Sequence, residues 1–182
     1  MFFTKLSASY DRSSFDCGNM ELNTFLKEYA TSFVKRKLCQ VHVLVDNNAV
    51  IGFYTISPFT LDVRNFPEKI ARKYPKSMPF PCWLLGKLAL DKKYQGQKLG
   101  EKLLMAACEH AARLSNDDAG GFCIIVDAKD QNAKNFYLNY GFIAFKDDPL
   151  RLYLPLPTEE GSIKWNCISI KQKITEIKII KN

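Results

Sequence analysis

The sequence predicts a fold of mixed class, α/β in its α+β form, because two different apolar periods alternate along it. Valines alternate over 41–45 before a turn at 46–48, and a second apolar run follows over 50–56, which predicts a β-hairpin. Apolar residues three and four positions apart over 103–114 predict one buried face of an α-helix. A length of 182 residues is enough for one domain with a substantial core.

The other expected elements follow from the same periods and from cap and turn residues. The segment 58–81 holds five of the eight prolines and is expected to be a long irregular connection. The tail after Thr158 shows both an alternating and a helical period, so no element is assigned to it. In chain order we expect a helix with its apolar period over 22–33 and its N-cap at Asp16 or Asn19, a short helix near 68–73, strands over 82–91 and 122–128, a helix over 132–140 ended by Gly141, and strands over 142–146 and 151–155.

Residues 92–104, between a strand and a helix, combine two glycines with several lysines. Gly96 and Gly100 stand at the entrance of that helix, where unpaired backbone N–H groups and the helix dipole favour an anion such as a phosphate. The stretch is not a Walker loop, because only three residues separate the glycines and Glu101 follows them. It also lacks the G-x-G-x-x-G pattern of dinucleotide-binding folds. The sequence therefore predicts a phosphate-binding loop of another kind.

The chain is basic, with 26 lysines and arginines against 19 acidic residues and a net charge of +7. Such an excess favours polyanionic partners, although surface cations are more often simply solvated. The cations are concentrated at Lys35, Arg36 and Lys37, at Lys69, Arg72, Lys73 and Lys76, and at Lys87, Lys92 and Lys93.

Several classes of protein are disfavoured by the composition. No apolar run approaches the roughly 18 residues of a membrane span, and the N-terminus lacks a signal-peptide pattern, so we expect a cytoplasmic protein without a membrane partner. The six cysteines include no C-x-x-C pair and are expected to be reduced, mostly buried thiols. His42 and His110 are the only histidines and are expected in a strand and on a helix. The sequence therefore predicts no metal site and no Ser–His or Cys–His pair.

The motif Leu88-Ala89-Leu90-Asp91 followed by Gln95-Gly96-Gln97-Lys98-Leu99-Gly100 resembles the GNAT N-acetyltransferases. In that family a strand runs into the pattern R/Q-x-x-G-x-G/A, whose backbone N–H groups hold the pyrophosphate of acetyl-CoA. Gln95 opens the pattern here and Gly100 closes it, while Lys98 stands where the family has glycine. The resemblance implies acetyl-CoA as cofactor and the GNAT fold, which is a twisted, mixed but mostly antiparallel sheet flanked by helices, with splayed central strands.

Further pieces of the sequence are similar to the GNAT toxins of toxin–antitoxin pairs. These toxins acetylate the amino acid on charged tRNA and are silenced by a ribbon-helix-helix antitoxin, so the resemblance implies both as partners, together with a homodimer. It covers about residues 10–157, which predicts a single domain over 1–157 and an extension of unassigned role over 158–182. The pieces are Phe15-Asp16-Cys17-Gly18 with Leu22-Asn23, the run from Gly52 to Ser57, the run from Pro81 to Asp91, and Val126-Asp127-Ala128 with the run from Ala133 to Tyr137.

The resemblance also assigns roles to individual residues. Tyr137 matches the tyrosine that follows phenylalanine in the family's short helix, and we expect it to be the general acid, because a tyrosine with a pKa of about 10 is protonated at neutral pH. The alternative is that Tyr137, like Phe136, packs against the sheet. The expected cofactor-binding residues are Leu88, Ala89, Leu90, Gln95, Gly96, Gln97, Lys98, Leu99, Gly100, Glu101, Asn132 and Phe136, and the expected tRNA contacts are Lys35, Arg36, Lys92 and Lys93.

No general base is evident, although Asp127 or Glu101 could act through a water. An α-amine with a pKa of about 8 is already substantially neutral, whereas a lysine amine near 10.4 is not, so an aminoacyl ester suits a site without a base. Two alternatives stay open: a GNAT enzyme that acetylates a protein N-terminus or a small amine, and a catalytically inactive module that binds CoA or nucleic acid. Lys98 favours the second alternative, and the sequence leaves open whether it helps or hinders CoA binding.

Overall fold

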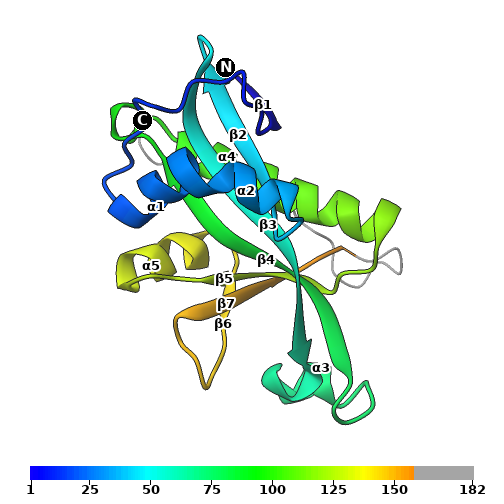
Figure 1. The fold of residues 1–182 in the computed structure, drawn as a ribbon. Coiled ribbons are helices and arrows are strands. Elements are labelled where there is room, and N and C mark those ends of the chain that lie inside the picture. The colour runs from blue at the N-terminus through cyan, green and yellow to red at the C-terminus, as the bar shows by residue number, and fades with distance from the viewer. Residues whose placement is uncertain (158–182) are drawn as a thin grey trace.

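The computed structural model describes residues 1–157, which form a seven-stranded sheet with helices on both faces (Figure 1). The strand order is β1-β2-β3-β4-β5-β7-β6, and only the β4–β5 pair is parallel among these strands. The expected mixed, mostly antiparallel sheet is therefore confirmed. The strands are β1 (Phe2–Lys5), β2 (Gln40–Asp46), β3 (Ala49–Asp62), β4 (Pro79–Leu90), β5 (Cys123–Asp127), β6 (Ile143–Ala144) and β7 (Arg151–Pro155).

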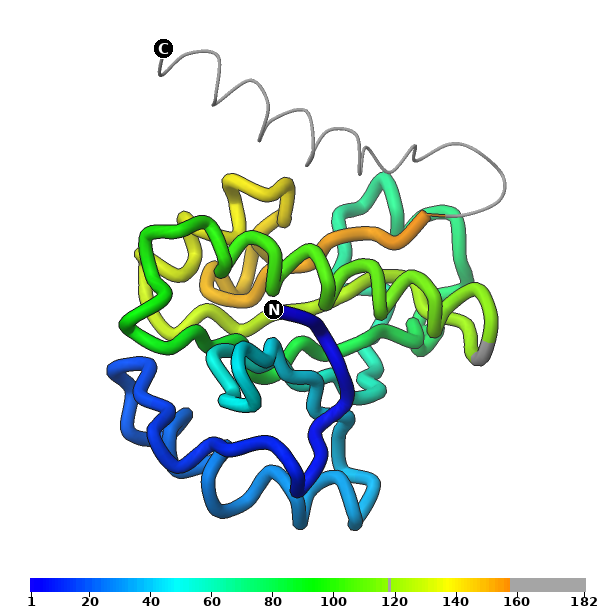
Figure 2. The backbone as a smooth tube through the Cα atoms, turned by 90° about the horizontal axis from the view of Figure 1, so that it is seen from above, coloured from blue at the N-terminus to red at the C-terminus, as the bar shows by residue number. Residues whose placement is uncertain are grey.

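Two helical layers bury opposite faces of the sheet, as Figure 2 shows for the N-terminal helical segment and α4. The first layer is a continuous run whose N-cap is Asn19, which accepts a hydrogen bond from the Leu22 N–H at 3.1 Å. The second layer is α4, whose apolar face packs on Ile51 and Leu85 of the sheet. The helices are α1 (Met20–Thr24), the π-helical turn η1 (Phe25–Tyr29), α2 (Ala30–Lys35), η2 (Val63–Asn65), α3 (Glu68–Ala71), η3 (Lys92–Tyr94), α4 (Leu99–Arg113), η4 (Leu114–Asp118) and α5 (Gln131–Asn139).

The strand β4 leaves its neighbour β5 part-way along the sheet. The parallel pairing of the two strands ends at Leu84 and Ile125. Directly beyond this point the register of β4 against β3 shifts between Thr55 and Ile56, which leaves Gly86 as an extra, unpaired residue. A β-bulge of this kind bends its strand and increases the local twist, so β4 turns away from β5. The splayed central strands expected from the family resemblance are therefore present.

The prediction of an irregular connection over 58–81 is wrong at both of its ends. There β3 and β4 continue as a two-stranded arm that extends beyond the rest of the sheet and carries α3 (Figure 1). The prolines are compatible with strand here because each strand of the arm has only one neighbour: pairing with β2 ends at Ile56, and pairing with β5 begins at Cys82. The short helix expected near 68–73 is present as α3.

Two smaller differences concern the outer strands. The sequence does not predict the edge strand β1, because its four residues are mostly exposed and show no apolar alternation. The strand expected over 142–146 is limited to β6, whose two residues are the ones that pair with β7, and Phe142 and Phe145 on either side of it are buried in the core. The expected extension over 158–182, with Cys167, lies outside the described residues.

The cysteines of residues 1–157 are reduced thiols, and three of the five are buried, as expected. Cys82 and Cys123 lie side by side on β4 and β5, with their Sγ atoms 3.4 Å apart. Within this described part of the chain, no group of three or more His, Cys, Asp or Glu side chains could hold a metal ion. None of its helices combines the length and the apolar character that crossing a membrane requires.

The two histidines lie on a strand and on a helix, as expected, and they stack on each other beneath α4. The ring centroids of His42 and His110 are 4.2 Å apart, and His42 Nδ1 lies 2.9 Å from the Tyr54 hydroxyl. Burial, together with the nearby cations of Lys5 and Arg113, lowers the pKa of both histidines to about 4, and His110 contributes to the lowering at His42. Both rings are therefore neutral at pH 7.

We expect the free energy of unfolding to decrease as the pH falls from 6.5 toward 4. In this window the histidines of the unfolded chain bind protons while His42 and His110 in the folded chain stay neutral, so acid favours unfolding. Each histidine contributes at most about 1.4 kcal/mol per pH unit. Denaturant titrations at pH 7, 6 and 5 measure the slope, and His110→Gln should reduce it. A stability that does not change over this range would contradict the prediction.

Candidate active site

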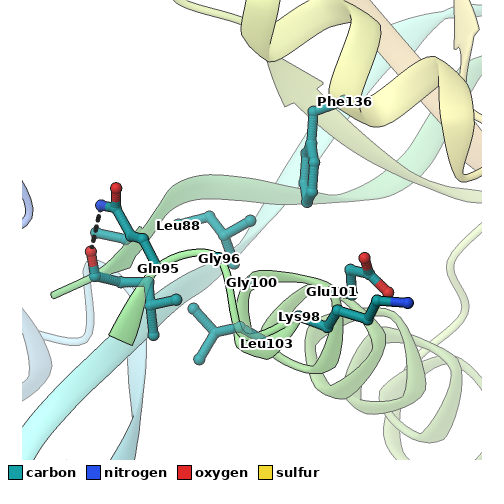
Figure 3. A pocket seen from close by; sticks show the side chains of 10 residues that line it. Leu88, Gln95, Gly96, Lys98, Gly100, Glu101, Leu103 and Phe136 are labelled. Atoms are coloured by element: carbon teal, nitrogen blue, oxygen red, sulfur yellow. Dashed lines mark hydrogen bonds between the residues drawn. The ribbon is translucent and has the colours of Figure 1, made fainter. Parts of the chain in front are cut away.

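The divergence of β4 from β5 opens two connected clefts. The first, called here the loop cleft, has a volume of about 380 Å³ and lies between the end of β4, the segment 95–100 and Phe136 of α5 (Figure 3). The second, the strand cleft, has a volume of about 340 Å³ and lies between the far half of β4, the end of β5, α5 and the segment 17–22. A molecule bound in one cleft can reach the other, because both are lined by Leu88, Ala89, Leu90 and Gln95.

The segment 95–100 has the open backbone that the sequence predicts for a phosphate-binding loop. Gly96 adopts a φ of +76°, and a Cβ atom added at Gly96 or Gly100 would meet nothing within 4 Å. α4 begins directly after Lys98, and no side chain caps its N-terminus. The N–H groups of its first turn and the positive end of its dipole are therefore available to an anion. This arrangement fits a pyrophosphate group.

Lys98 occupies the left-handed region of backbone conformation, with a φ of 60° and a ψ of 13°. Glycine adopts this conformation freely, whereas for other residues it costs about 1–2 kcal/mol. This is a physical reason for glycine at the equivalent position of the family pattern. The Lys98 side chain is exposed and lies beside Glu101 at the rim of the loop cleft (Figure 3). It therefore adds a cation to the rim without filling the loop.

The structure places most of the expected cofactor-binding residues in the lining of the loop cleft, and three outside it. Gln97 turns its side-chain amide to the Lys93 carbonyl oxygen at 3.2 Å, and Leu99 is buried in the core. Asn132 is exposed on the first turn of α5. Leu103 also lines the cleft, but its helical period marks it only as a core residue. The expected residues that do line the cleft are Leu88, Ala89, Leu90, Gln95, Gly96, Lys98, Gly100, Glu101 and Phe136.

Two adjacent aromatic residues of α5 face the two clefts. Asp130 caps this helix by accepting a hydrogen bond from the Ala133 N–H at 2.8 Å. Phe136 points into the loop cleft (Figure 3). Tyr137 lines the strand cleft and packs its ring on Phe142 with centroids 5.4 Å apart. Within residues 1–157, no group accepts a hydrogen bond from the Tyr137 hydroxyl. Burial raises the pKa of Tyr137 to about 12, so it is protonated at neutral pH and free to donate.

Neither carboxylate that the sequence suggests as a base stands unpaired in the strand cleft. Asp127 accepts hydrogen bonds from Arg151 Nε at 2.6 Å and from Arg151 Nη2 at 3.1 Å, which occupies both of its oxygens. Glu101 lies in the other cleft, and burial together with the Glu101 carboxylate raises the pKa of Tyr140. The remaining carboxylate in the lining of the strand cleft is the exposed Glu21, on the first turn of α1.

The four cations expected to contact tRNA do not form a single cluster. Lys35 and Arg36 are exposed at the C-terminal end of α2. Lys92 and Lys93 lie on η3, and the Lys92 ammonium forms an ion pair with Asp16 at 3.0 Å, just before α1. The two pairs thus lie toward opposite ends of the helical run from α1 to α2, whose sixteen residues have a length of about 24 Å at the rise of an α-helix. A ligand that contacts both pairs must span that distance.

Residues 17–22 line the strand cleft, although the sequence predicts no role for them there. The turn-like stretch Phe15-Asp16-Cys17-Gly18 indicates only the start of a helix. The available signal is the resemblance itself, since this stretch belongs to the pieces shared with the GNAT toxins.

A family model described as the GNAT acetyltransferase domain matches residues 37–144. The chain belongs to the GNAT acetyltransferase family. The match begins just after α2 and ends with β6, so it includes the splayed strands, the glycine-containing segment 95–100 and Tyr137. The family and the fold expected from the motifs are therefore confirmed.

Several known proteins are similar to the chain over most of its length. The probable toxin TacT of Sinorhizobium fredii is 28% identical over 158 residues, which cover 82% of this chain and 87% of the relative. A tRNA-acetylating toxin of Mycobacterium tuberculosis is 30% identical over 150 residues, with 82% and 89% covered. The solved structure of AtaT complexed with acetyl-methionyl-tRNAfMet has a TM-score of 0.79 at 28% identity, over 85% of this chain and 94% of that one. A tyrosine-to-phenylalanine mutant of KacT has the same TM-score at 29% identity, over 94% and 97%.

The backbone of Lys98 leads to a prediction about stability. We expect Lys98→Gly to raise the free energy of unfolding by about 0.5–1 kcal/mol, because glycine removes the steric cost of the left-handed conformation. Lys98→Ala is the matched control: it removes the same charge but keeps a Cβ atom, so it should give no such gain. Denaturant unfolding of the three proteins measures the difference. Equal stabilities of the Gly and Ala variants would show that the conformation carries no cost.

Proposed function

We propose that this GNAT protein transfers the acetyl group of acetyl-CoA to the α-amine of aminoacyl-tRNA, and so acts as the translation-blocking toxin of a toxin–antitoxin pair. The observation that carries the proposal is the pair of adjoining clefts, with the open glycine loop 95–100 in one and Tyr137 in the lining of the other. Two similar proteins support the substrate, since AtaT is solved with acetyl-methionyl-tRNAfMet and the relative from Mycobacterium tuberculosis is named a tRNA-acetylating toxin.

The loop cleft suits acetyl-CoA, which supplies an activated acetyl group as a thioester. The N–H groups of residues 96–100 and the N-terminus of α4 match the charge of its pyrophosphate, and Lys98 adds a cation at the rim. The free edge of β4 over 88–90 offers backbone groups to the pantetheine arm and a donor for the oxyanion. A complex of the similar AtaT and AtaR proteins is solved with acetyl-CoA, which supports this cofactor.

Tyr137 is the proposed general acid of the transfer. Its hydroxyl is protonated at neutral pH, lines the strand cleft and is unpaired within residues 1–157, so it can donate its proton to the departing thiolate. The ring is fixed by its packing on Phe142, which orients the hydroxyl without using a hydrogen bond. Donation therefore breaks no existing contact of the protein.

Because both oxygens of Asp127 are hydrogen-bonded to Arg151, the strand cleft favours an acceptor amine of which a substantial fraction is already neutral. An α-amine has a pKa of about 8, so a substantial fraction is neutral near pH 7, whereas a lysine amine near 10.4 is almost fully charged. With Asp127 held by Arg151, the strand cleft suits the first kind of amine. The α-amine of an aminoacyl ester is of that kind.

The proposed partners follow from the same relatives. AtaT is solved with the C-terminus of the antitoxin AtaR, and KacTA is solved as a complex with DNA. We propose a ribbon-helix-helix antitoxin as the inhibitor of this chain, a homodimer as its active form and the cytoplasm as its location.

A substrate panel tests the function directly. Wild-type protein is given labelled acetyl-CoA together with charged tRNA, a peptide with a free N-terminus, or a polyamine. We expect label on the aminoacyl moiety of charged tRNA and little on the other acceptors. Transfer to the peptide or the polyamine in preference to charged tRNA would contradict the proposal, and so would the absence of any transfer despite acetyl-CoA binding.

We expect Tyr137→Phe to reduce turnover on charged tRNA by roughly 10²-fold or more, because it removes the proton donor and keeps the ring packed on Phe142. The Kd for acetyl-CoA, measured by calorimetry, should stay close to the wild-type value. Expression of this variant should also relieve any growth arrest that the wild type causes. Turnover near the wild-type level would exclude Tyr137 as the general acid.

The surface at the end of α2 gives a further prediction. We expect the double change Lys35→Ala and Arg36→Ala to weaken the binding of charged tRNA. The slope of log K against log salt should also become shallower, by about 0.7–0.9 for each phosphate that the protein no longer neutralises. Lys69→Ala with Lys73→Ala, at and just beyond α3 on the distant arm, is the matched control for net charge. Equal effects of the two pairs would indicate nonspecific attraction instead of a binding surface at α2.

A further inference from the structure

Asp91, which follows the last residue of β4, is a buried carboxylate that joins two distant segments of the chain. Its exposed fraction is 6%, and among the acidic side chains that the structure describes it is the only one classed as buried. Oδ1 accepts a hydrogen bond from the Lys93 N–H at 2.9 Å, which caps η3. Oδ2 accepts one from the N–H of Asp16, 75 residues earlier in the chain, also at 2.9 Å. Each oxygen therefore holds a different segment.

The segment that Asp91 holds is itself tightly bonded. Asp16 Oδ1 accepts hydrogen bonds from the Gly18 N–H at 2.9 Å and from Asn23 Nδ2 at 2.8 Å, and these bonds together with Lys92 lower the pKa of Asp16 to about 2. Asn23 Oδ1 in turn accepts a hydrogen bond from the N–H of Cys17 at 2.9 Å. The stretch from Asp16 to the first turn of α1 is thus one connected unit.

Gly18 shows how closely this unit lies against η3. A Cβ atom added to Gly18 would lie 2.8 Å from Cε of the flexible Lys92 side chain, and the φ of Gly18 is +85°, so any other residue would displace Lys92 and strain the backbone. A backbone hydrogen bond from the Lys92 N–H to the Asp16 carbonyl oxygen, at 2.9 Å, runs parallel to the side-chain contacts. The two segments therefore meet along their backbones as well as through Asp91.

The joined segments belong to different parts of the site. Cys17, Asn19, Glu21 and Leu22 form one side of the strand cleft, called here the acceptor wall. The segment after Asp91 leads into the phosphate-binding loop, and Gln95 at its start lines both clefts. Asp91 itself lines neither cleft, so it acts only through the segments that it holds.

We propose that Asp91 is a positioning residue for the acceptor substrate, which fixes the acceptor wall against the phosphate-binding loop. A buried carboxylate is costly unless its oxygens are hydrogen-bonded, and both oxygens of Asp91 are satisfied by the N–H groups of the two segments it joins. If the acceptor wall moved away, Asp91 Oδ2 would lose its hydrogen bond from the Asp16 N–H while still buried. The free-energy cost of that loss keeps the wall in place. The inference rests on the proposed function for the identity of the acceptor substrate, whereas the hydrogen bonds from the two segments to Asp91 are independent of it.

Asp91→Asn tests the proposal. Asparagine keeps the shape of Asp91 but has one acceptor oxygen, so it can keep the bond to Lys93 N–H or to Asp16 N–H but not both. We expect KM for charged tRNA to rise about tenfold, as for the removal of one buried hydrogen bond, while Kd for acetyl-CoA changes by less than about threefold. We also expect the backbone amides of residues 15–23 to exchange hydrogen about tenfold faster or more.

Asp62→Asn is the matched control. Asp62 caps η2 by accepting a hydrogen bond from the Arg64 N–H at 2.8 Å, as Asp91 caps η3, but it lies on the arm. Asp62→Asn should change neither KM for charged tRNA, nor Kd for acetyl-CoA, nor the hydrogen exchange of residues 15–23. Asn23→Ala is a second test if Asp91→Asn does not fold, since it frees the same wall from Asp16 and Cys17 without altering η3. We expect the same rise in KM from it.

A loss of acetyl-CoA affinity as large as the rise in KM would overturn the proposal, because Asp91 would then support the loop cleft alone. Unchanged hydrogen exchange over residues 15–23 in Asp91→Asn would overturn it as well. If wild-type protein does not acetylate charged tRNA, the proposed function fails, and the exchange experiment still decides whether Asp91 holds the wall. In the double variant of Asp91→Asn and Asn23→Ala, the rise in KM, expressed as a free energy, should be smaller than the sum of the two single rises. That result would support the view that both residues hold the same wall.

Discussion

The departure of β4 from β5 at Leu84 is the constraint on which the rest of the site depends. From this point the inner edge of β4 has no strand partner within residues 1–157, and unpaired backbone groups inside a protein are costly. The strand nevertheless stays in place, because its other edge is paired with β3 as far as Leu90 and its side chains enter the cores on both faces. The free edge is thus held open by packing on three sides, ready for a ligand that completes its hydrogen bonds.

The bulge at Gly86 explains why the strands separate where they do. The bulge lies two residues beyond the last β4–β5 pair. A Cβ atom added to Gly86 would lie 3.2 Å from Thr55 Oγ1, which is a close contact, so glycine fits this position best. The bend directs the end of β4 toward η3 and the phosphate-binding loop, while β5 continues toward α5 and Tyr137. The single bulge at Gly86 therefore places the segment 95–100 and Tyr137, the proposed acid, on the two sides of the space between β4 and β5.

The features that the sequence could predict are those encoded by residues near one another in the chain. The phosphate-binding loop, the helix after it and the position of Tyr137 on a short capped helix all follow from local patterns and from the family motif. The arm over 58–81 could not be predicted, because prolines indicate irregular structure unless one knows that the strands have only one neighbour there. The ion pair of Lys92 joins residues 76 positions apart, so local sequence assigns this cation to a polyanionic partner instead. The sequence marks Lys98 as a departure from the motif, but only the structure shows its left-handed backbone.

The two clefts also separate the groups that handle protons. Glu101 and Tyr140 interact on the side of the loop cleft, and Asp127 is neutralised by Arg151 at the end of β5. Tyr137 lines the strand cleft and, with a pKa that burial raises to about 12, stays protonated at neutral pH. With Tyr137 as the proposed acid, we expect such a site to protonate a leaving group but to give little help in deprotonating an attacking one. We therefore expect its choice of acceptor to be set in part by the acidity of the amine itself, before any contact with the rest of the substrate.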